Sequence, residues 1–146
     1  MIFDVSSREA SMGDCIFCDI VMGRIPSIRV YEDENFIALM DINPLTPGHL
    51  LIVSREHYAT TLDAPDELLA KALPLAKKLA EAAMLGVGAP AFNIFVNSGP
   101  ESGQVVPHWH LHVVPRKSPK ELPLHGGAPA DLTKLPFTAA AIRENL

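Results

Sequence analysis

One short segment, residues 104–114, constrains the fold more than any other part of the chain. It reads Gln-Val-Val-Pro-His-Trp-His-Leu-His-Val-Val and sets His108, His110 and His112 at strict two-residue spacing. Alternate side chains of a β-strand point to the same side, so the spacing predicts a strand with three imidazoles on one face, about 6 to 7 Å apart in succession. The opposite face would carry the apolar residues Trp109, Leu111 and Val113. We therefore expect one face to pack into a core and the other to carry chemistry.

Two simpler interpretations of this segment are a metal-binding His-rich tract and a half-buried strand with solvated histidines. Three histidines in register are nevertheless uncommon in a chain that has 6 among 146 residues. The pattern Gln-x-Val-x-His-x-His-x-His, followed by apolar residues, resembles the signature of the histidine-triad (HIT) family of nucleotidyl hydrolases and transferases. The resemblance extends upstream through the sequence Asn-Ser-Gly-Pro-Glu-Ser-Gly at 97–103.

The remaining periodicity predicts an α+β fold. In chain order we expect a short turn or helix at 15–22, a hairpin of strands at 28–31 and 36–40, a loop at 41–48, a buried strand at 49–54, a helix at 63–85, and strands at 91–96 and 107–115. This order favours a meander over a parallel sheet. The family resemblance implies the HIT fold, an antiparallel sheet of about five strands with one long and one or two short helices.

The long helix has recognisable boundaries in the sequence. Asp63 is a plausible N-cap, and Gly86 and Gly88 are expected to end the helix. Pro74 lies inside it and removes a backbone donor, so we expect a kink there.

Three segments divide the chain. Residues 1–13 have no strong periodicity and are expected to form an N-terminal extension, whereas the family resemblance implies a HIT domain at 14–117. Residues 118–146 are rich in Pro and Gly and predict an irregular tail, with a possible short helix at 137–145 and a solvated His125.

The composition of the chain limits its expected binding partners and its expected cellular location. A net charge of −5 and a pI near 5.6 argue against a nucleic-acid groove, which needs a basic stripe, but a small anionic ligand remains compatible. The first residues lack a basic segment followed by an apolar run, so no signal peptide is expected, and no apolar run approaches the ~20 residues of a membrane span. We expect a cytoplasmic protein without membrane contact.

Resemblance to the family assigns roles to the histidines. His110, the middle one, would be the nucleophile that forms a covalent nucleotidyl intermediate, since a neutral imidazole attacks phosphorus better than water does. His112 would contact the phosphate and support its developing charge. His49 occupies the family's fourth histidine position and would fix ring tautomers. Without the resemblance, His112 would be a hydrogen-bonded structural histidine and His49 an ordinary residue at the end of a strand.

The same resemblance suggests a phosphate-binding loop formed by Asn97, Gly103, Gln104 and Val105, in which glycines let backbone amides approach an anion. The best-known eukaryotic branches place Ser or Thr where Val105 stands. Valine has no hydroxyl, so water or another histidine would have to protonate the leaving group.

Asp41 matches the family position that accepts hydrogen bonds from ribose hydroxyls, although a turn-forming aspartate before Ile-Asn-Pro is nearly as good an interpretation. The base would be enclosed by the apolar residues Ile42, Phe17 and Ile20.

Cys15-x-x-Cys18 has three interpretations. A redox dithiol is disfavoured because no strand precedes it, which leaves two buried thiols or half of a zinc site. In its possible zinc site the sequence resembles many bacterial HIT proteins. This resemblance implies that Cys15, Cys18, His57 and His108 are the ligands of a closed, structural zinc ion. His110 would then act without a catalytic metal.

The leading functional hypothesis is therefore a hydrolase that acts on a purine nucleotide or nucleoside phosphoramidate, and the family resemblance also implies a homodimer. Alternatives are a dinucleoside polyphosphate hydrolase, in which Arg116 and the tail meet the extra phosphates, a nucleotide-binding scaffold, and a zinc-dependent hydrolase.

Overall fold

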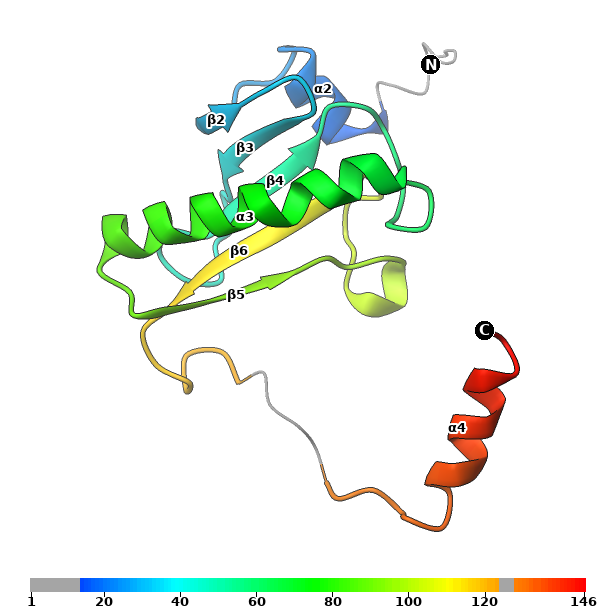
Figure 1. Ribbon diagram of the computed structural model, residues 1–146. Helices are drawn as coiled ribbons and strands as arrows, with labels where there is room; N and C mark the ends of the chain where they lie inside the picture. The colour runs from blue at the N-terminus through cyan, green and yellow to red at the C-terminus, as the bar shows by residue number, and fades with distance from the viewer. Residues whose placement is uncertain (1–13, 124–127) are drawn as a thin grey trace.

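The computed structural model describes residues 14–123 and 128–146 (Figure 1). The expected extension at 1–13 and His125 lie outside these ranges. Five antiparallel strands form one sheet in the order β2-β3-β4-β6-β5. Their bounds are β2 Arg29–Glu32, β3 Phe36–Met40, β4 Leu50–Ser54, β5 Ala91–Phe95 and β6 His110–Arg116. The helices are α2 Ile16–Val21, α3 Asp66–Val87, the 3-10 turn η2 Pro100–Ser102 and α4 Leu135–Arg143. The predicted α+β fold with a five-stranded antiparallel sheet is confirmed.

The order of the strands departs from a simple meander. β6 inserts between β4 and β5, so that β5 forms the edge of the sheet although it precedes β6 in the chain. β6 is almost entirely buried, whereas Ala91 and Phe92 of β5 are exposed. The more buried strand thus takes the position with two neighbours.

The two faces of the sheet have different coverings (Figure 1). α3 crosses one face and packs on a core that includes all three apolar residues of the histidine segment, Trp109, Leu111 and Val113. α2 lies on the other face, over a smaller core formed with residues of β3 and β4. The predicted division of β6 into a packed face and an opposite, histidine-bearing face is therefore confirmed.

The expected ends of the long helix need two corrections. The N-cap is Pro65, and the Asp63 carboxylate instead accepts a hydrogen bond of 3.0 Å from the Thr60 amide in the preceding turn. Gly86 lies within the helix, and only Gly88, at φ 72°, ends it, because the left-handed conformation rather than glycine content stops a helix. The helix is continuous through Pro74, where a kink was expected.

The histidine strand begins later than predicted, at His110 instead of Pro107. His108 precedes it in a bend, where the His108 amide donates to the Val106 carbonyl at 2.8 Å and the Trp109 amide donates to the Tyr58 carbonyl at 2.6 Å. These two bonds replace the ladder that Pro107, without an N–H group, could not continue. His108 consequently belongs to a different site from His110 and His112.

Beyond β6, residues 117–123 and 128–134 are irregular, and α4 lies away from the sheet (Figure 1). In residues 14–123 and 128–146, no helix combines the length and hydrophobicity that crossing a bilayer requires.

Candidate active site

His110 and His112 project from β6 into a cleft of about 410 Å³ on the α2 side of the sheet. Their ring centroids are 4.9 Å apart with the planes inclined by 59°. His110 is only 7% exposed, and His112 is half-buried. Register places them between β4 and β5: His110 opposite Val53, and His112 opposite both Leu51 and Phe95.

A chain of hydrogen bonds determines the tautomer of His112. The Leu45 amide donates to Nδ1 of the buried His49 at 2.9 Å, so Nδ1 is the acceptor and the ring's proton is on Nε2. That Nε2–H donates to His112 Nδ1, also at 2.9 Å. In the neutral His112 ring the proton then lies on Nε2, which makes this atom a donor at the cleft.

His110 has the complementary arrangement. Its Nδ1 lies 2.7 Å from the carbonyl oxygen of His108, which can only accept, so Nδ1 carries the proton. The lone pair of a neutral His110 is consequently on Nε2. The site therefore holds a lone pair on one ring and an N–H donor on its neighbour.

Burial keeps these rings neutral. It is the largest effect on both histidines, lowering the pKa of His110 and bringing the pKa of His112 to about 4. The charge of Asp41 opposes this effect on both rings, and the proximity of His49 adds to it on His112. Near neutral pH the nucleophilic form of His110 is therefore available.

The cleft walls contain most of the residues expected to hold a nucleoside. Phe17, Ile20, Asp41 and Ile42 all line it. Phe17 meets His110 edge-on, with ring centroids 4.9 Å apart. Asp41 is tied to its turn, where its Oδ1 accepts from the Asn43 amide at 2.8 Å, and its Oδ2 lies 3.5 Å from His49 Nε2.

Some residues of the loop before β6 line the cleft, and others hold the loop in place. Gly103, at φ 100°, and Val105, which is 90% exposed, line the cleft. The Gln104 side chain instead ties the loop, because its Oε1 accepts from the Gly99 amide and its Nε2 donates to the Ala59 carbonyl. A Cβ atom at Gly103 would lie 3.5 Å from Asn97 Nδ2, so the Asn97 amide lies beside this turn. Neither Gln104 nor Asn97 lines the cleft.

One aromatic residue at this site was missed by the sequence reasoning. Phe95 stacks on His112 with ring centroids 4.5 Å apart and planes inclined by 15°. Its only signal in the sequence is an aromatic residue at the end of an apolar strand, and its partner follows from the sheet register.

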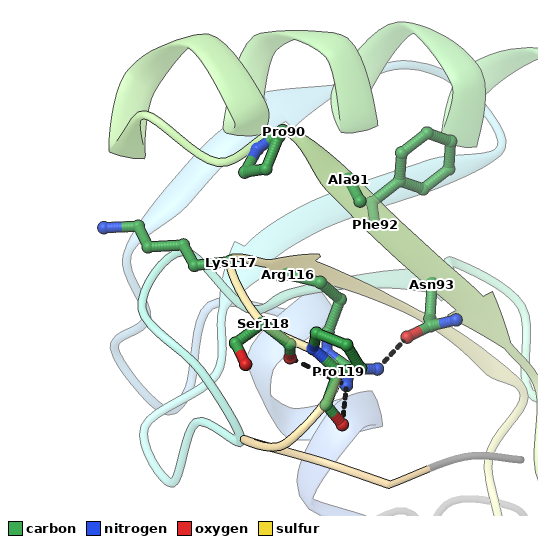
Figure 2. A pocket seen from close by; sticks show the side chains of 8 residues that line it. All are labelled: Pro90, Ala91, Phe92, Asn93, Arg116, Lys117, Ser118 and Pro119. Atoms are coloured by element: carbon green, nitrogen blue, oxygen red, sulfur yellow. Dashed lines mark hydrogen bonds between the residues drawn. The ribbon is translucent and has the colours of Figure 1, made fainter.

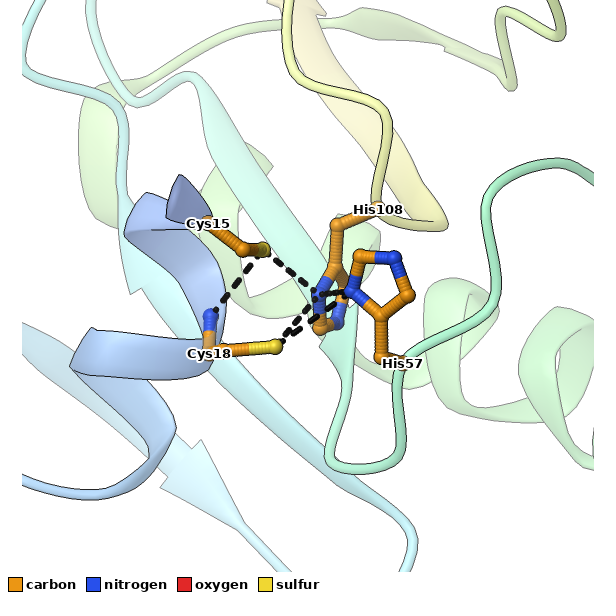
Figure 3. Close-up of side chains that lie close together, drawn as sticks. All are labelled: Cys15, Cys18, His57 and His108. Atoms are coloured by element: carbon orange, nitrogen blue, oxygen red, sulfur yellow. Dashed lines mark hydrogen bonds between the residues drawn. The ribbon is translucent and has the colours of Figure 1, made fainter. Parts of the chain in front are cut away.

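A second cluster lies next to the active site. Figure 3 shows Cys15 and Cys18 from the start of α2 facing His57 and His108. Cys15 Sγ lies 3.3 Å from His108 Nδ1, Cys18 Sγ lies 3.3 Å from His57 Nδ1, and the two Nδ1 atoms are 3.1 Å apart. Four donor atoms from three separate segments thus converge on one point.

These distances fit a tetrahedral zinc ion. With Zn–S near 2.3 Å and Zn–N near 2.0–2.1 Å, the edges of such a tetrahedron are about 3.5 Å for S···N and about 3.3 Å for N···N. His108 Nε2 lies 2.7 Å from the Ser54 carbonyl oxygen and must donate to it, so the Nδ1 lone pair faces the cluster. Burial lowers the pKa of His108 to about 4, which keeps this ring in the ligating form.

A third group, Asp41, His49 and His112, also brings three possible ligand atoms within 4.8 Å of one another. The Leu45 amide argues against a metal there, because it places the proton of His49 on the very nitrogen that would have to bind the ion. We therefore interpret this group as a hydrogen-bonded relay.

Arg116 does not line the histidine cleft. It is 9% exposed and lines a different pocket beside β5 (Figure 2). Its guanidinium donates to Asn93 Oδ1, Glu121 Oε1 and the Leu122 carbonyl, and so fastens the first part of the tail to the sheet. The expectation that Arg116 meets additional phosphates is therefore not supported.

Comparison with known families identifies the class of protein that this fold and this histidine arrangement define. The HIT domain family model matches residues 22–119, and the chain belongs to this family.

Particular relatives include an adenylylsulfatase of Arabidopsis thaliana, 38% identical over 104 residues, which are 71% of this chain and 53% of the plant protein. The chain thus spans about half the length of that relative. An adenosine 5′-monophosphoramidase of Saccharomyces cerevisiae is 40% identical over 106 residues, 73% of this chain and 65% of the yeast protein.

Solved structures show the same fold. A Streptococcus mutans crystal structure superposes with a TM-score of 0.83 at 37% identity, covering 92% of this chain and 87% of the other. A zinc-bound histidine triad family protein from Mycobacterium smegmatis gives a TM-score of 0.72 at 36% identity, covering 91% of this chain and 96% of the other.

Proposed function

We propose that this protein hydrolyses nucleoside phosphoramidates or related AMP derivatives at the α-phosphate, through a covalent nucleotidyl intermediate on His110. The observation that carries the proposal is the fixed pair of tautomers: a lone pair on His110 Nε2 beside an N–H donor on His112 Nε2. The names of the yeast and plant relatives support an amide or a mixed anhydride of AMP as substrate.

The reaction proceeds in two displacements. His110 Nε2 attacks phosphorus, a P–N bond to the ring forms, and the bond to the leaving group breaks with its electron pair. The resulting imidazolium is stabilised by the carbonyl of His108, which accepts its Nδ1–H. His112 donates to a phosphoryl oxygen as negative charge accumulates there. Water then attacks phosphorus and gives up a proton to the solvent, and the P–N bond breaks with its electron pair returning to His110 Nε2. The nucleoside monophosphate is released and His110 is neutral again.

Position 105 determines how the leaving group is protonated. Val105 has no hydroxyl and is open to solvent at the cleft edge, so water supplies the proton that an amine leaving group needs. Substrates whose leaving groups are already weakly basic should therefore react faster.

The remaining residues of the proposed site bind the substrate. Phe17, Ile20 and Ile42 enclose a purine base, and Asp41 accepts hydrogen bonds from the ribose hydroxyls. The Gly103 turn and the Val105 amide hold the phosphate. Asn97 and Gln104 support that turn from behind.

We propose Cys15, Cys18, His57 and His108 as the ligands of a structural zinc, supported by their geometry and by the zinc-bound mycobacterial neighbour. When bound, the ion supplies a closed tetrahedral link between α2 and the bend that precedes β6. The same bend presents the His108 carbonyl to His110. The link therefore positions both the cleft wall and the nucleophile, and no metal is needed for the chemistry.

The proposal also covers the domain bounds, the cellular location and the oligomeric state of the protein. Residues 14–117 form the catalytic domain and 118–146 a tail, with the protein acting in the cytoplasm on small molecules and not on nucleic acid. β5 is an uncharged edge strand, Ala-Phe-Asn-Ile-Phe, whose first residues are exposed, which supports pairing with a second copy in a homodimer.

A direct test measures hydrolysis of adenosine 5′-phosphoramidate by the wild-type protein and by His110→Ala. We expect the variant to lose at least about 10³-fold in kcat. His125→Ala, which removes a histidine of the tail, is the matched control and should retain wild-type turnover. Hydrolysis that survives in His110→Ala would remove the proposed nucleophile, and loss of nucleotide binding alone would favour a scaffold.

Competition between the phosphoramidate and a diadenosine polyphosphate separates the two enzymatic alternatives. Because the Arg116 guanidinium is engaged with the tail, we expect the phosphoramidate to have the higher kcat/KM. A chelator that stopped turnover while the fold persisted would instead indicate a zinc-dependent hydrolase.

A further inference from the structure

The side chain of Phe95 in β5 lies on the histidine face of the sheet, directly opposite His112. Phe95 and His112 are register partners, so their Cβ atoms are held on the same face by the ladder of the two strands. Their rings lie 4.5 Å apart and nearly parallel, at 15°. Among the ring contacts of His112 in the described part of the chain, this is the only one that covers the flat face of the imidazole, because the rings of His49 and His110 are inclined to it by 46° and 59°.

The other contacts leave one motion of this ring undetermined. The hydrogen bond from His49 Nε2 holds His112 at Nδ1, along the ring plane. One hydrogen bond fixes the position of Nδ1, but the ring plane can still tilt about the axis of that hydrogen bond. A flat surface stacked on the ring opposes the tilt, so the bond and the stack together determine where Nε2 points.

We propose that Phe95 is a positioning residue that holds the plane of His112 and so keeps its Nε2–H directed at the phosphate in the cleft. The inference rests on the proposed function, in which His112 donates to the phosphoryl oxygen. Phe95 touches neither substrate nor reacting atoms in this account. Its effect is on the transition state, in which the direction of that donor matters most.

Three variants isolate the flat face of the side chain. Phe95→Leu keeps an apolar residue but removes the aromatic plane, and Phe95→Met does the same if the leucine variant fails to fold. Phe95→Tyr keeps the plane and should rescue. Phe92→Leu is the control, because Phe92 belongs to the same strand but alternates to the opposite face and lines the pocket near Arg116 (Figure 2).

Two readouts are measured on each variant: the single-turnover rate of His110 adenylylation by adenosine 5′-phosphoramidate, and the ¹⁵N spectrum of the labelled imidazoles. In Phe95→Leu we expect the rate to fall about 3- to 10-fold, the typical value of an aromatic stack, while the Kd for AMP changes by less than about twofold. We also expect the His112 nitrogens to shift from the pure Nε2–H tautomer towards a mixture. Phe95→Tyr and Phe92→Leu should match the wild type in both readouts.

An unchanged His112 spectrum in Phe95→Leu overturns the proposal whatever the rate. So does a folded Phe95→Tyr variant that is as slow as Phe95→Leu. If the wild-type protein forms no adduct at all, the proposed hydrolase function fails, and the ¹⁵N spectra alone then decide the role of Phe95.

Discussion

Gly48, immediately before His49, is a position where the structure gives a definite stability prediction. Its φ is +89°, and a Cβ atom added there would lie 2.9 Å from Val87 Cγ1 and 3.1 Å from Pro115 Cγ. The left-handed conformation costs a non-glycine residue about 1–2 kcal/mol. Forcing a methyl group against α3 and β6 adds about 1–3 kcal/mol. We therefore expect Gly48→Ala to lower the free energy of unfolding by about 2–5 kcal/mol.

Gly88→Ala is the matched control. Gly88 also has a positive φ, +72°, but nothing lies within 4 Å of its added Cβ atom. Only the conformational cost of about 1–2 kcal/mol then applies. Urea unfolding followed by the fluorescence of Trp109, the one tryptophan and 2% exposed, measures both variants in the same core. Equal losses in the two variants would refute the reasoning, because the packing contribution would be absent.

Three further predictions follow from the site. Removing zinc by chelation should lower Tm by roughly 5 °C or more and release about one equivalent of metal, as measured by calorimetry and metal analysis, and an absence of bound zinc with both thiols titratable would contradict it. The pKa of His112 is about 4 in the folded protein and near 6.5 in the unfolded chain, so between these values the unfolded chain binds more protons. The free energy of unfolding should consequently fall as pH is lowered from 6.5 towards 4, and less steeply in His112→Asn; equal slopes in urea titrations would count against it. Val105→Ser should speed hydrolysis of amides with strongly basic leaving groups while changing stability by less than about 0.5 kcal/mol, since the side chain is exposed, and a uniform effect across leaving groups would be the wrong result.

Local patterns predicted most elements of the fold. Two apolar runs separated by a polar tetrapeptide marked the hairpin of β2 and β3, alternation marked the apolar face of β6, and the apolar stripe marked α3. The insertion of β6 between β4 and β5 was not predictable from periodicity, because strand order depends on which long-range pairing buries more surface. The end of α3 at Gly88 instead of Gly86 depended on a backbone angle that the residue type permits but does not require.

The candidate site, like the fold, was predictable from the sequence only in part. The family resemblance pointed to His110 and to the cluster of Cys15, Cys18, His57 and His108. The direction of the protons on His49 and His112 depends on the Leu45 amide, a backbone group that carries no signature in the sequence. The stack of Phe95 on His112 depends on sheet register and became visible only with the strands paired.

The most direct test of the central claim is intact-protein mass spectrometry of the wild-type protein quenched in alkali during turnover of adenosine 5′-phosphoramidate. We expect a base-stable, acid-labile mass increase of one adenylyl group that maps to His110 and disappears in His110→Ala. An adduct on another residue, or turnover in which no adduct accumulates even when the second step is slowed, would contradict it.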